Sequence, residues 1–327
     1  MASFLIKRLL FIGLLISSCS CAAEWYQKQF EVMGTQAKVE FEFDDSKYAD
    51  SLIEKVVAEM HRIDHLMSPY KSDSELSKIN QKASQHPVII SDELFELLQK
   101  SEYYSELTNG AFDISFSSIG YLYDFRKHQR PDKVQIKALT PQINYQGVRL
   151  NKVDKSVKFV NDKIKIDLGG IAKGHAVDRC IDILVKNGVK NAFINAGGDS
   201  RVIGKKNGRL WYIGIRHPRD EGKLIVNLPL EEVAISTSGD YERFFIEDGI
   251  RYHHIIDPKT GDSVRKSQSV TILANTSTIA DALSTSIFVL GSQKGLELVN
   301  KLPNVSAIII NESGKMMYSD DLVSPNG

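Results

Sequence analysis

The sequence predicts a single α+β domain in which helices pack on a mixed or antiparallel sheet. Strand-like and helix-like segments follow one another without the regular alternation that parallel βαβ units require. No internal repeat, low-complexity stretch or clear linker divides the chain after its N-terminal segment. The 327 residues are 42% hydrophobic, which is enough to bury a large core, and we therefore assign residues 30–327 to one domain.

Charge and cysteine content exclude several classes of protein. The 41 basic and 41 acidic residues give a formal net charge of zero, so there is no basic excess for binding nucleic acid or an anionic membrane surface. Two of the three cysteines lie near the start of the chain, which implies no disulfide framework. The third, Cys180, falls on an expected helix, and we interpret it as a small buried hydrophobic residue rather than a nucleophile.

The N-terminus has the pattern of a targeting segment. Lys7 and Arg8 provide positive charge, and the apolar residues 9–16 that follow are too few to span a bilayer. This stretch ends in Ile16-Ser17-Ser18-Cys19, which resembles a bacterial lipobox. Cleavage there would leave Cys19 as the lipid-carrying first residue of the mature chain.

We therefore expect residues 1–18 to be a cleaved lipoprotein signal peptide and residues 19–29 to be a tether between the lipid and the domain. The alternative is an ordinary signal peptide cut near Cys21-Ala22-Ala23. In both cases the mature protein works outside the cytoplasm. The lipobox favours a bacterial cell-membrane lipoprotein that faces the periplasm and is anchored in the inner membrane.

The first part of the domain is expected to form a hairpin followed by helices. Alternating apolar residues on both sides of Gly34 predict two strands, and an apolar stripe of helical period predicts a long amphipathic helix. Ser91 is a good N-cap, and Asn109-Gly110 is a helix stop. The expected elements are strands within residues 30–43, a helix over residues 48–67, a short helix that starts at residues 72–76, and a helix over residues 91–107.

Further along, residues 116–145 have weak periodicity, and we expect a solvated loop there that could act as a lid. A hairpin over residues 148–160 and a strand over residues 163–168 follow. The remaining expected elements are strands over residues 192–195, 210–216, 224–228, 305–310 and 315–318, and helices over residues 278–288 and 294–302.

A glycine-rich turn, Gly169-Gly170-Ile171-Ala172-Lys173-Gly174, joins the strand expected at residues 163–168 to a helix expected over residues 175–187. Free backbone N–H groups and the helix dipole at such a junction can cradle an anion. The glycine spacing matches neither a Walker loop nor the dinucleotide fingerprint. A tight strand-to-helix turn without a ligand is the alternative.

Asp281 and Thr285 lie one turn apart, on the same face of the helix expected at residues 278–288. A carboxylate and a hydroxyl at this spacing can share one hard cation, because both are oxygen ligands of the kind that Mg²⁺ accepts. The alternative is an ordinary helix start, with Thr278 or Ser277 as the N-cap and Asp281 near the positive end of the helix.

Residues 252–261 contain two adjacent histidines, His253 and His254. Neighbouring residues of a strand point to opposite faces, so at most one of the two faces any given site. The neighbourhood offers too few nitrogen and sulfur ligands for zinc. A catalytic role for one histidine therefore competes with a purely structural one.

Several motifs stand in a fixed order along the chain, and together they resemble the ApbE family, the FAD:protein FMN transferases. They are Met33-Gly34-Thr35, Gly110-Ala111-Phe112-Asp113, Asp167-Leu168 with the glycine-rich turn, Asn195-Ala196-Gly197-Gly198-Asp199, Thr237-Ser238-Gly239-Asp240-Tyr241, His254-Ile255-Ile256-Asp257-Pro258 with Thr260-Gly261, and Ala280-Asp281-Ala282 with Thr285. The resemblance covers the chain from about residue 30 to about residue 310 and implies one domain of this family's kind.

The resemblance implies a Mg²⁺-dependent enzyme that splits the pyrophosphate of FAD, attaches FMN through a phosphoester to a Thr or Ser hydroxyl of a target flavoprotein, and releases AMP. The implied acceptors are flavoprotein subunits of membrane electron-transfer complexes. By position, Asp281, Thr285 and the carbonyl of Ala172 match the metal ligands. His254 matches a histidine implicated in catalysis, where it would take the hydroxyl proton while Asp257 orients it.

The same resemblance assigns FAD contacts to Met33, Ser68, Tyr70, Asp113, Lys173, His254 and Ile256. The chain departs from the family pattern at Ser115, where threonine is usual and a nearby proline is absent, and at His175, where tyrosine is commoner. Two other functions remain open at this point. One is an FAD pyrophosphatase that forms FMN and AMP with water, and the other is a flavin-binding lipoprotein without enzymatic activity.

Overall fold

The computed structural model describes residues 23–323. The expected signal peptide, residues 1–18, and the expected lipid site at Cys19 lie outside this range. The strands are β1 (Glu24–Val32), β2 (Thr35–Phe43), β3 (Val88–Ile89), β4 (Val148–Asn151), β5 (Ser156–Phe159), β6 (Ala192–Ala196), β7 (Asp199–Ile203), β8 (Trp211–Arg216), β9 (Leu224–Leu230), β10 (Val233–Gly239), β11 (Phe244–Glu247), β12 (Ile250–His253), β13 (Ser267–Ala274), β14 (Ser306–Asn311) and β15 (Met316–Tyr318).

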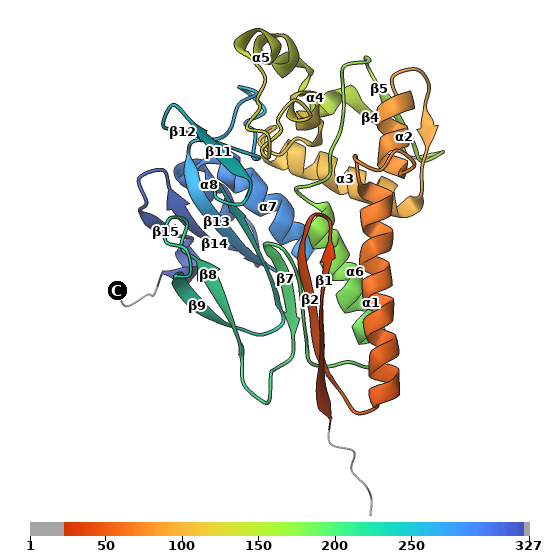
Figure 1. The fold of residues 1–327 in the computed structure, drawn as a ribbon, viewed down its shortest axis with the longest axis vertical. Helices are drawn as coiled ribbons and strands as arrows, with labels where there is room; N and C mark the ends of the chain where they lie inside the picture. Colours follow the sequence, from red (N-terminus) through yellow and green to blue (C-terminus); the bar gives the residue numbers. More distant parts are fainter. Residues whose placement is uncertain (1–22, 324–327) are drawn as a thin grey trace, which may run out of the picture.

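The helices lie mainly on one side of these strands (Figure 1). They are α1 (Ser46–Met67), α2 (Glu75–Lys82), α3 (Asp92–Leu107), α4 (Ser117–Gly120), α5 (Lys133–Leu139), α6 (Ala172–Lys186), α7 (Ser277–Leu290) and α8 (Ser292–Val299). Short 3₁₀ turns are η1 (Ile114–Phe116), η2 (Thr140–Gln142), η3 (Tyr145–Gly147) and η4 (Asp320–Leu322). None of the helices in residues 23–323 combines the length and the apolar character needed to cross a bilayer.

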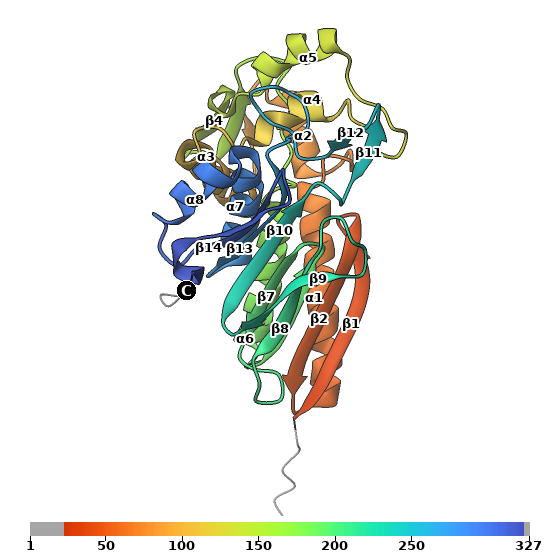
Figure 2. The same ribbon diagram turned by 90° about the vertical axis from the view of Figure 1, so that its left-hand side faces the viewer.

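The central sheet has eight strands in the order β1-β2-β6-β7-β10-β13-β14-β15. All of its pairings are antiparallel, which confirms the α+β fold class and selects the antiparallel form of the expected sheet. Helices α1, α6 and α7 cover one face with the main core, and the β8–β9 hairpin lies over the other face (Figure 2). One face of the sheet is therefore covered by helices and the other by a β-hairpin.

Strand β10 shows how the alternation of residues divides the two sides. Ile235 belongs to the small core under β8–β9, whereas Ser236 faces the helical side and hydrogen-bonds Ser284 of α7. Successive residues of a strand point to opposite faces, so Ser238 also faces α7, with its Oγ 2.8 Å from that of Ser284. The strand thus presents hydroxyl groups to the polar residues of α7.

Helix α7 is buried on nearly all sides, including the polar residues Ser277, Asp281 and Ser284. Its N-cap is Thr276, not Ser277 or Thr278 as the sequence indicated. The difference has a tertiary cause, because the carboxylate of Asp178 on α6 accepts the N–H groups of Ser277 at 2.9 Å and Thr278 at 2.8 Å. A side chain from another helix therefore completes the cap.

The strand expected over residues 163–168 does not form, although Ile164 and Ile166 are both buried. The side chain of Asn80 takes the place of a neighbouring strand. Its Nδ2 donates to the carbonyl of Ile166 at 2.9 Å, and its Oδ1 accepts the N–H of Ile166 at 2.8 Å. The backbone groups of Ile166 are therefore paired with a side chain and not with a neighbouring strand. The alternation of apolar residues predicted a strand correctly as to burial but wrongly as to pairing.

Residues 116–145 are not simply the solvated loop that we expected. They include α4, α5 and η2, and they form a small core of their own in which Ile119, Tyr123 and Ile143 pack with Ile256. The β1 strand also begins earlier than expected, at Glu24, so residues 24–29 belong to the sheet and not to a tether. Cys180 is buried with 0% exposure, and burial raises the pKa of its thiol, which fits the structural role that we expected.

Candidate functional site

The first turn of α6 lies directly against the first turns of α7. A Cβ atom on Gly174 would lie 2.2 Å from the carbonyl oxygen of Ser277 and 2.8 Å from the Cβ of Asp281, so the approach requires glycine. This contact lets the N–H of Gly174 donate to Oδ2 of Asp281 at 3.0 Å. The glycine-rich turn and Asp281, far apart in the sequence, therefore meet as we expected.

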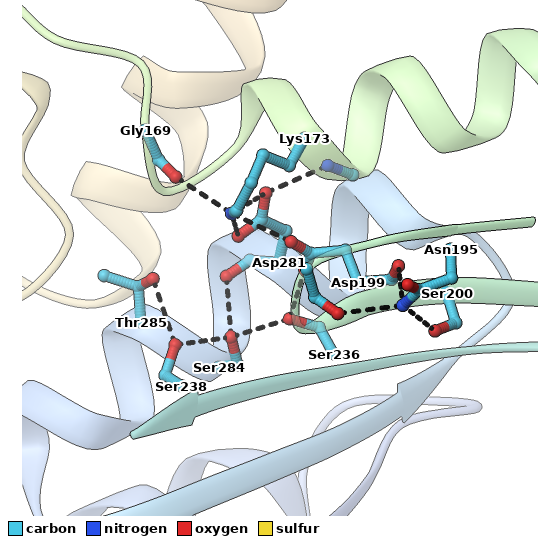
Figure 3. Close-up of polar contacts among 12 residues, drawn as sticks. Gly169, Lys173, Asn195, Asp199, Ser200, Ser236, Ser238, Asp281, Ser284 and Thr285 are labelled. Atoms are coloured by element: carbon cyan, nitrogen blue, oxygen red, sulfur yellow. Dashed lines mark hydrogen bonds and ion pairs between the residues drawn. The ribbon is translucent and has the colours of Figure 1, made fainter. Parts of the chain in front are cut away.

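Lys173 lies at the centre of the resulting polar cluster (Figure 3). Its Nζ is 2.8 Å from Oδ2 of Asp199 and 3.4 Å from Oδ1 of Asp281, and it donates to the carbonyl of Gly169 at 3.1 Å. Desolvation disfavours the ammonium, but the two carboxylates outweigh it and raise the pKa of Lys173. Burial and the nearby Asp199 charge raise the pKa of Asp281, because both disfavour its ionised form.

Two side-chain oxygen ligands of the kind that Mg²⁺ prefers, those of Asp281 and Thr285, lie beside the glycine-rich turn. A Cβ atom on Gly170 would lie 3.2 Å from Oγ1 of Thr285, so the turn passes close over the Thr285 hydroxyl. Ala172, whose carbonyl is the third expected ligand, stands in the same turn between Gly170 and Gly174, and Gly174 holds Asp281. The chemistry and the closeness of these groups fit one Mg²⁺ ion.

No cluster of metal-binding side chains of another kind is found in residues 23–323. Nowhere in the described part of the chain do three or more His, Cys, Asp or Glu side chains gather closely enough to hold a metal ion.

A row of hydroxyl groups leads from Asp199 to Thr285. The sequence indicates the hydroxyls of residues 235–240 as possible ligands of a phosphate or sugar, but it did not predict that they bond to Asp199 and Ser284. Ser236 donates to Oδ1 of Asp199 at 2.6 Å, and its Oγ is 3.0 Å from that of Ser284. Ser238 lies 2.8 Å from Ser284 and 3.4 Å from Oγ1 of Thr285. The two-residue spacing of Ser236 and Ser238, which puts both on one face of the strand, was the available signal.

His254 follows directly after β12, close to the polar cluster. Its Nδ1 is enclosed and has no hydrogen-bond partner among the described residues. Desolvation, aided by the charges of His253, Arg243 and Lys173, lowers the pKa of His254 to about 3, so the ring is neutral at physiological pH. The charge of Lys173 contributes to this lowering of the pKa, so His254 lies within electrostatic range of Lys173.

Asp257 does not orient His254, contrary to our expectation. Its Oδ2 instead accepts a hydrogen bond from Nζ of Lys266 at 2.9 Å. His253 has a structural role, because it is only 2% exposed and its Nε2 lies 2.6 Å from the carbonyl oxygen of Val264. The two histidines thus occupy different surroundings, as their adjacent positions indicated.

Two of the expected FAD contacts, Met33 and Tyr70, lie on turns with Arg243 nearby. Met33 and Gly34 form the tight β1–β2 turn with φ angles of 53° and 67°, and the Gly34 carbonyl accepts a hydrogen bond from Arg243 at 3.5 Å. Tyr70 is 87% exposed on the loop after α1, and both Arg243 and Asp167 lie within electrostatic range of its hydroxyl. The Tyr70 ring is thus open to stacking on a ligand.

The Asp113 carboxylate is engaged within the fold. Its Oδ1 accepts hydrogen bonds from the N–H of Ser115 at 2.8 Å and from the Ser115 hydroxyl at 2.6 Å, while Oδ2 accepts the N–H of Tyr145 at 2.9 Å. Ser115, where the sequence departs from the expected threonine, thus holds Asp113 through both its backbone and its hydroxyl. Asp113 shapes the wall next to Phe112, whose ring would lie 3.3 Å from a Cβ on Gly170.

Ser68 and Ile256 also have roles in the fold. Ser68 ends α1, and its Oγ accepts the N–H of Tyr70 at 3.2 Å, so it shapes the loop that carries the exposed ring. Ile256 is 5% exposed, and its side chain packs in the small core with Ile119. Any contact of Ile256 with a ligand would therefore be through its backbone.

Comparison with known proteins agrees with this geometry. Residues 33–309 match the ApbE family. The chain is 30% identical over 317 residues to a FAD:protein FMN transferase of Treponema pallidum, covering 91% of this chain and 88% of that protein. It is 32% identical over 312 residues to a FAD:protein FMN transferase of Haemophilus influenzae, covering 91% of this chain and 90% of that protein.

Solved structures give the same result. The ApbE protein of Thermotoga maritima superposes with a TM-score of 0.84 at 33% identity, covering 91% of this chain and 98% of that one. The flavin transferase ApbE of Vibrio cholerae superposes with a TM-score of 0.81 at 27% identity, with the same coverage. With its motifs in order, its fold matched and its polar cluster assembled, this chain belongs to the ApbE family.

Proposed function

We propose that this chain transfers FMN from FAD to a threonine or serine hydroxyl of a target flavoprotein, with Mg²⁺, forming a phosphoester and releasing AMP. The relatives named above as FAD:protein FMN transferases support the reaction. The observation that supports the proposal is the meeting of the glycine-rich turn with Asp281 and Thr285, because it brings together a carboxylate, a hydroxyl and the Lys173 ammonium, which are the groups that a Mg²⁺-bound diphosphate needs.

The residues of the cluster have separate tasks in this reaction. Asp281, Thr285 and the Ala172 carbonyl would hold Mg²⁺, which when bound neutralises charge on the phosphate oxygens. Lys173 keeps the two buried carboxylates in place and adds positive charge next to the turn. The exposed ring of Tyr70 would stack on the flavin or adenine ring.

His254 would act as the general base. The acceptor oxygen bonds to the phosphorus of the FMN half, the bridging P–O bond of the diphosphate breaks, and AMP leaves with the bridging oxygen. The proton of the acceptor hydroxyl passes to the imidazole of His254, whose Nδ1 has no partner and whose ring is neutral. The unpartnered Nδ1 and the neutral state of the ring support this role.

The decisive experiment mixes the purified chain, FAD, Mg²⁺ and a candidate acceptor, and looks for a fluorescent threonine with the mass of FMN added. We expect Asp281→Ala to abolish the transfer while the protein still folds. Asp182→Ala, on the half-exposed part of α6, is the matched control and retains the transfer. Full transfer by Asp281→Ala would exclude the cation site, and free FMN formed regardless of acceptor would identify a hydrolase.

The chain's cellular place belongs to the same proposal. We infer that Cys19 carries the lipid and that the enzyme faces the periplasm from the inner membrane, where flavoprotein subunits of electron-transfer complexes would be its acceptors. Growth with radiolabelled palmitate should label the wild-type chain and leave Cys19→Ala unlabelled. Equal labelling of both chains would exclude lipidation at this residue.

A further inference from the structure

The Ser236, Ser284 and Ser238 hydroxyls, which we call the serine row, join Asp199 to Thr285 across the contact between β10 and α7 (Figure 3). Ser284 has 0% exposure, Ser236 has 2% and Asp199 has 1%. Burying hydroxyl groups between a strand and an apolar helix costs free energy unless each group is hydrogen-bonded. Each hydroxyl of the serine row has one proton, so the donor and the acceptor of each hydrogen bond can be assigned in turn.

The end at Asp199 fixes the direction of the first bond. The ammonium of Lys173 lies 2.8 Å from Oδ2 of Asp199, so this group is an ionised carboxylate and can only accept. Its Oδ1 therefore accepts the single proton of Ser236 at 2.6 Å. Ser236 then has no proton left for Ser284, and it can only accept from that residue.

The remaining protons follow from this start. Ser284 has one proton and two neighbours that can only accept it, namely Oγ of Ser236 at 3.0 Å and the carbonyl of Asp281 at 3.0 Å. The contact of Ser238 with Ser284 at 2.8 Å therefore uses the proton of Ser238. If Ser284 instead donated its proton to Ser238, neither Ser236 nor the carbonyl of Asp281 would receive one, so fewer contacts would be hydrogen bonds.

Thr285 stands at the far end of the row. Since Ser238 has given its proton to Ser284, the contact of 3.4 Å between Ser238 and Thr285 must use the proton of Thr285. The hydroxyl of Thr285 therefore directs its hydrogen toward β10. Its lone pairs are directed away from β10, toward the side where Gly170 passes over Oγ1.

We propose that the serine row, anchored on Asp199, is a positioning device that keeps the lone pairs of Thr285 aimed at the cation. This inference rests on the proposed function, because it concerns the same Mg²⁺ site. The Asn195 side chain holds the turn that carries Asp199, since its Nδ2 donates to the carbonyl of Asp199 at 3.2 Å and to that of Gly197 at 2.8 Å. The turn that carries the anchoring carboxylate is thus itself held in place.

The test is a titration of the purified full-length chain with Mn²⁺, which takes the same oxygen ligands as Mg²⁺ and is followed by electron paramagnetic resonance. Ser238→Ala removes the acceptor of the Thr285 proton, and Ser284→Ala frees Ser238 to turn its proton toward Thr285. We expect each change to weaken Mn²⁺ binding by about 10- to 100-fold, as is typical when a group that orients a metal ligand is lost.

Two variants of the same strand serve as controls. Ser238→Thr keeps a hydroxyl at the position and should retain the wild-type affinity for Mn²⁺. Thr237→Val removes the hydroxyl that lies 2.8 Å from that of Thr271 on the opposite face of β10, so it tests loss of a strand hydroxyl as such. We expect it to bind Mn²⁺ as the wild type does.

Wild-type affinity in both alanine variants would overturn the proposal, and so would an equal loss in Thr237→Val. Thermal unfolding without metal separates misfolding from a local effect, because a folded variant that binds Mn²⁺ weakly supports positioning. If the wild type binds Mn²⁺ and Asp281→Ala does not, the cation site stands and only the role of the serine row is at issue. If the wild type binds no Mn²⁺, the cation site and this inference are both wrong.

Discussion

The backbone N–H of Gly174 donates to Oδ2 of Asp281 at 3.0 Å, and this one bond ties the first turn of α6 to the second turn of α7. It exists because no side chain separates the two helices at that point. The carboxylate is thereby fixed next to Lys173 and at the edge of the glycine-rich turn. The expectations that follow concern this contact and the groups around it.

Gly174→Ala should lower the free energy of unfolding by about 1–3 kcal/mol or more, because the new methyl group would overlap the Ser277 carbonyl. It should also abolish FMN transfer, since separating the helices removes Asp281 from the turn. Urea unfolding and the transfer assay measure the two effects. Gly208→Ala is the control, because Gly208 has a φ of 75° in open space and its strain of about 1–2 kcal/mol leaves the site intact. Retained transfer in Gly174→Ala would contradict the role of this contact.

Lys173→Met should destabilise the protein by about 3–5 kcal/mol, because it leaves Asp199 and Asp281 buried together without a counter-charge. Adding Asp199→Asn to this variant should restore part of the loss, since only one buried charge then remains. Urea unfolding in the presence of EDTA measures both. A double variant no more stable than Lys173→Met would show that repulsion between the carboxylates is not the cause.

Glu93 on α3 joins three helices, because it lies 2.9 Å from Nε2 of His175 and 2.7 Å from the guanidinium of Arg62. The hydrogen bond with His175 is the main cause that lowers the pKa of Glu93, to about 2. A lowered carboxyl pKa adds stability above the unfolded value and loses it as pH falls through the folded value. The interaction of Glu93 therefore stabilises the fold at neutral pH and fades as the pH falls from 4.5, the ordinary pKa of glutamate, to about 2.

Glu93→Gln should thus reduce the free energy of unfolding by about 1–3 kcal/mol at pH 6. The difference from the wild type should shrink as the pH is lowered below 4.5 and vanish near 2. Urea unfolding at a series of pH values gives the comparison. A difference that stays constant over this range would mean that the charge of Glu93 is not responsible.

Tyr70→Ala should raise the KM for FAD by about 2- to 10-fold, the equivalent of about 0.5–1.5 kcal/mol of ring stacking. Stability should hardly change, because the Tyr70 side chain is 87% exposed. Tyr212→Ala is a matched control, since Tyr212 is 68% exposed on β8 and away from the polar cluster. Unchanged KM in Tyr70→Ala would remove this residue from the FAD site.

Local patterns in the sequence predicted many elements correctly. The hairpin around Met33 and Gly34, the long helix α1 and the helix that carries Asp281 were all recognisable, because their periodicity and stop signals act within a few residues. The prediction of a strand at residues 163–168 was wrong, because the backbone there bonds to the side chain of Asn80 on α2. No local pattern could reveal that an amide side chain replaces a strand.

The spacing of Asp281 and Thr285 was set by the helix period, and the turn from Gly169 to Gly174 was visible from its three glycines. Such features arise within one turn of backbone, so the sequence by itself determines them. Only the tertiary structure brought Lys173, Asp199 and the serine row to the same place, because they come from α6, β7, β10 and α7. Their alignment depends on how the helices pack on the sheet, and that is decided by the burial of the whole apolar core.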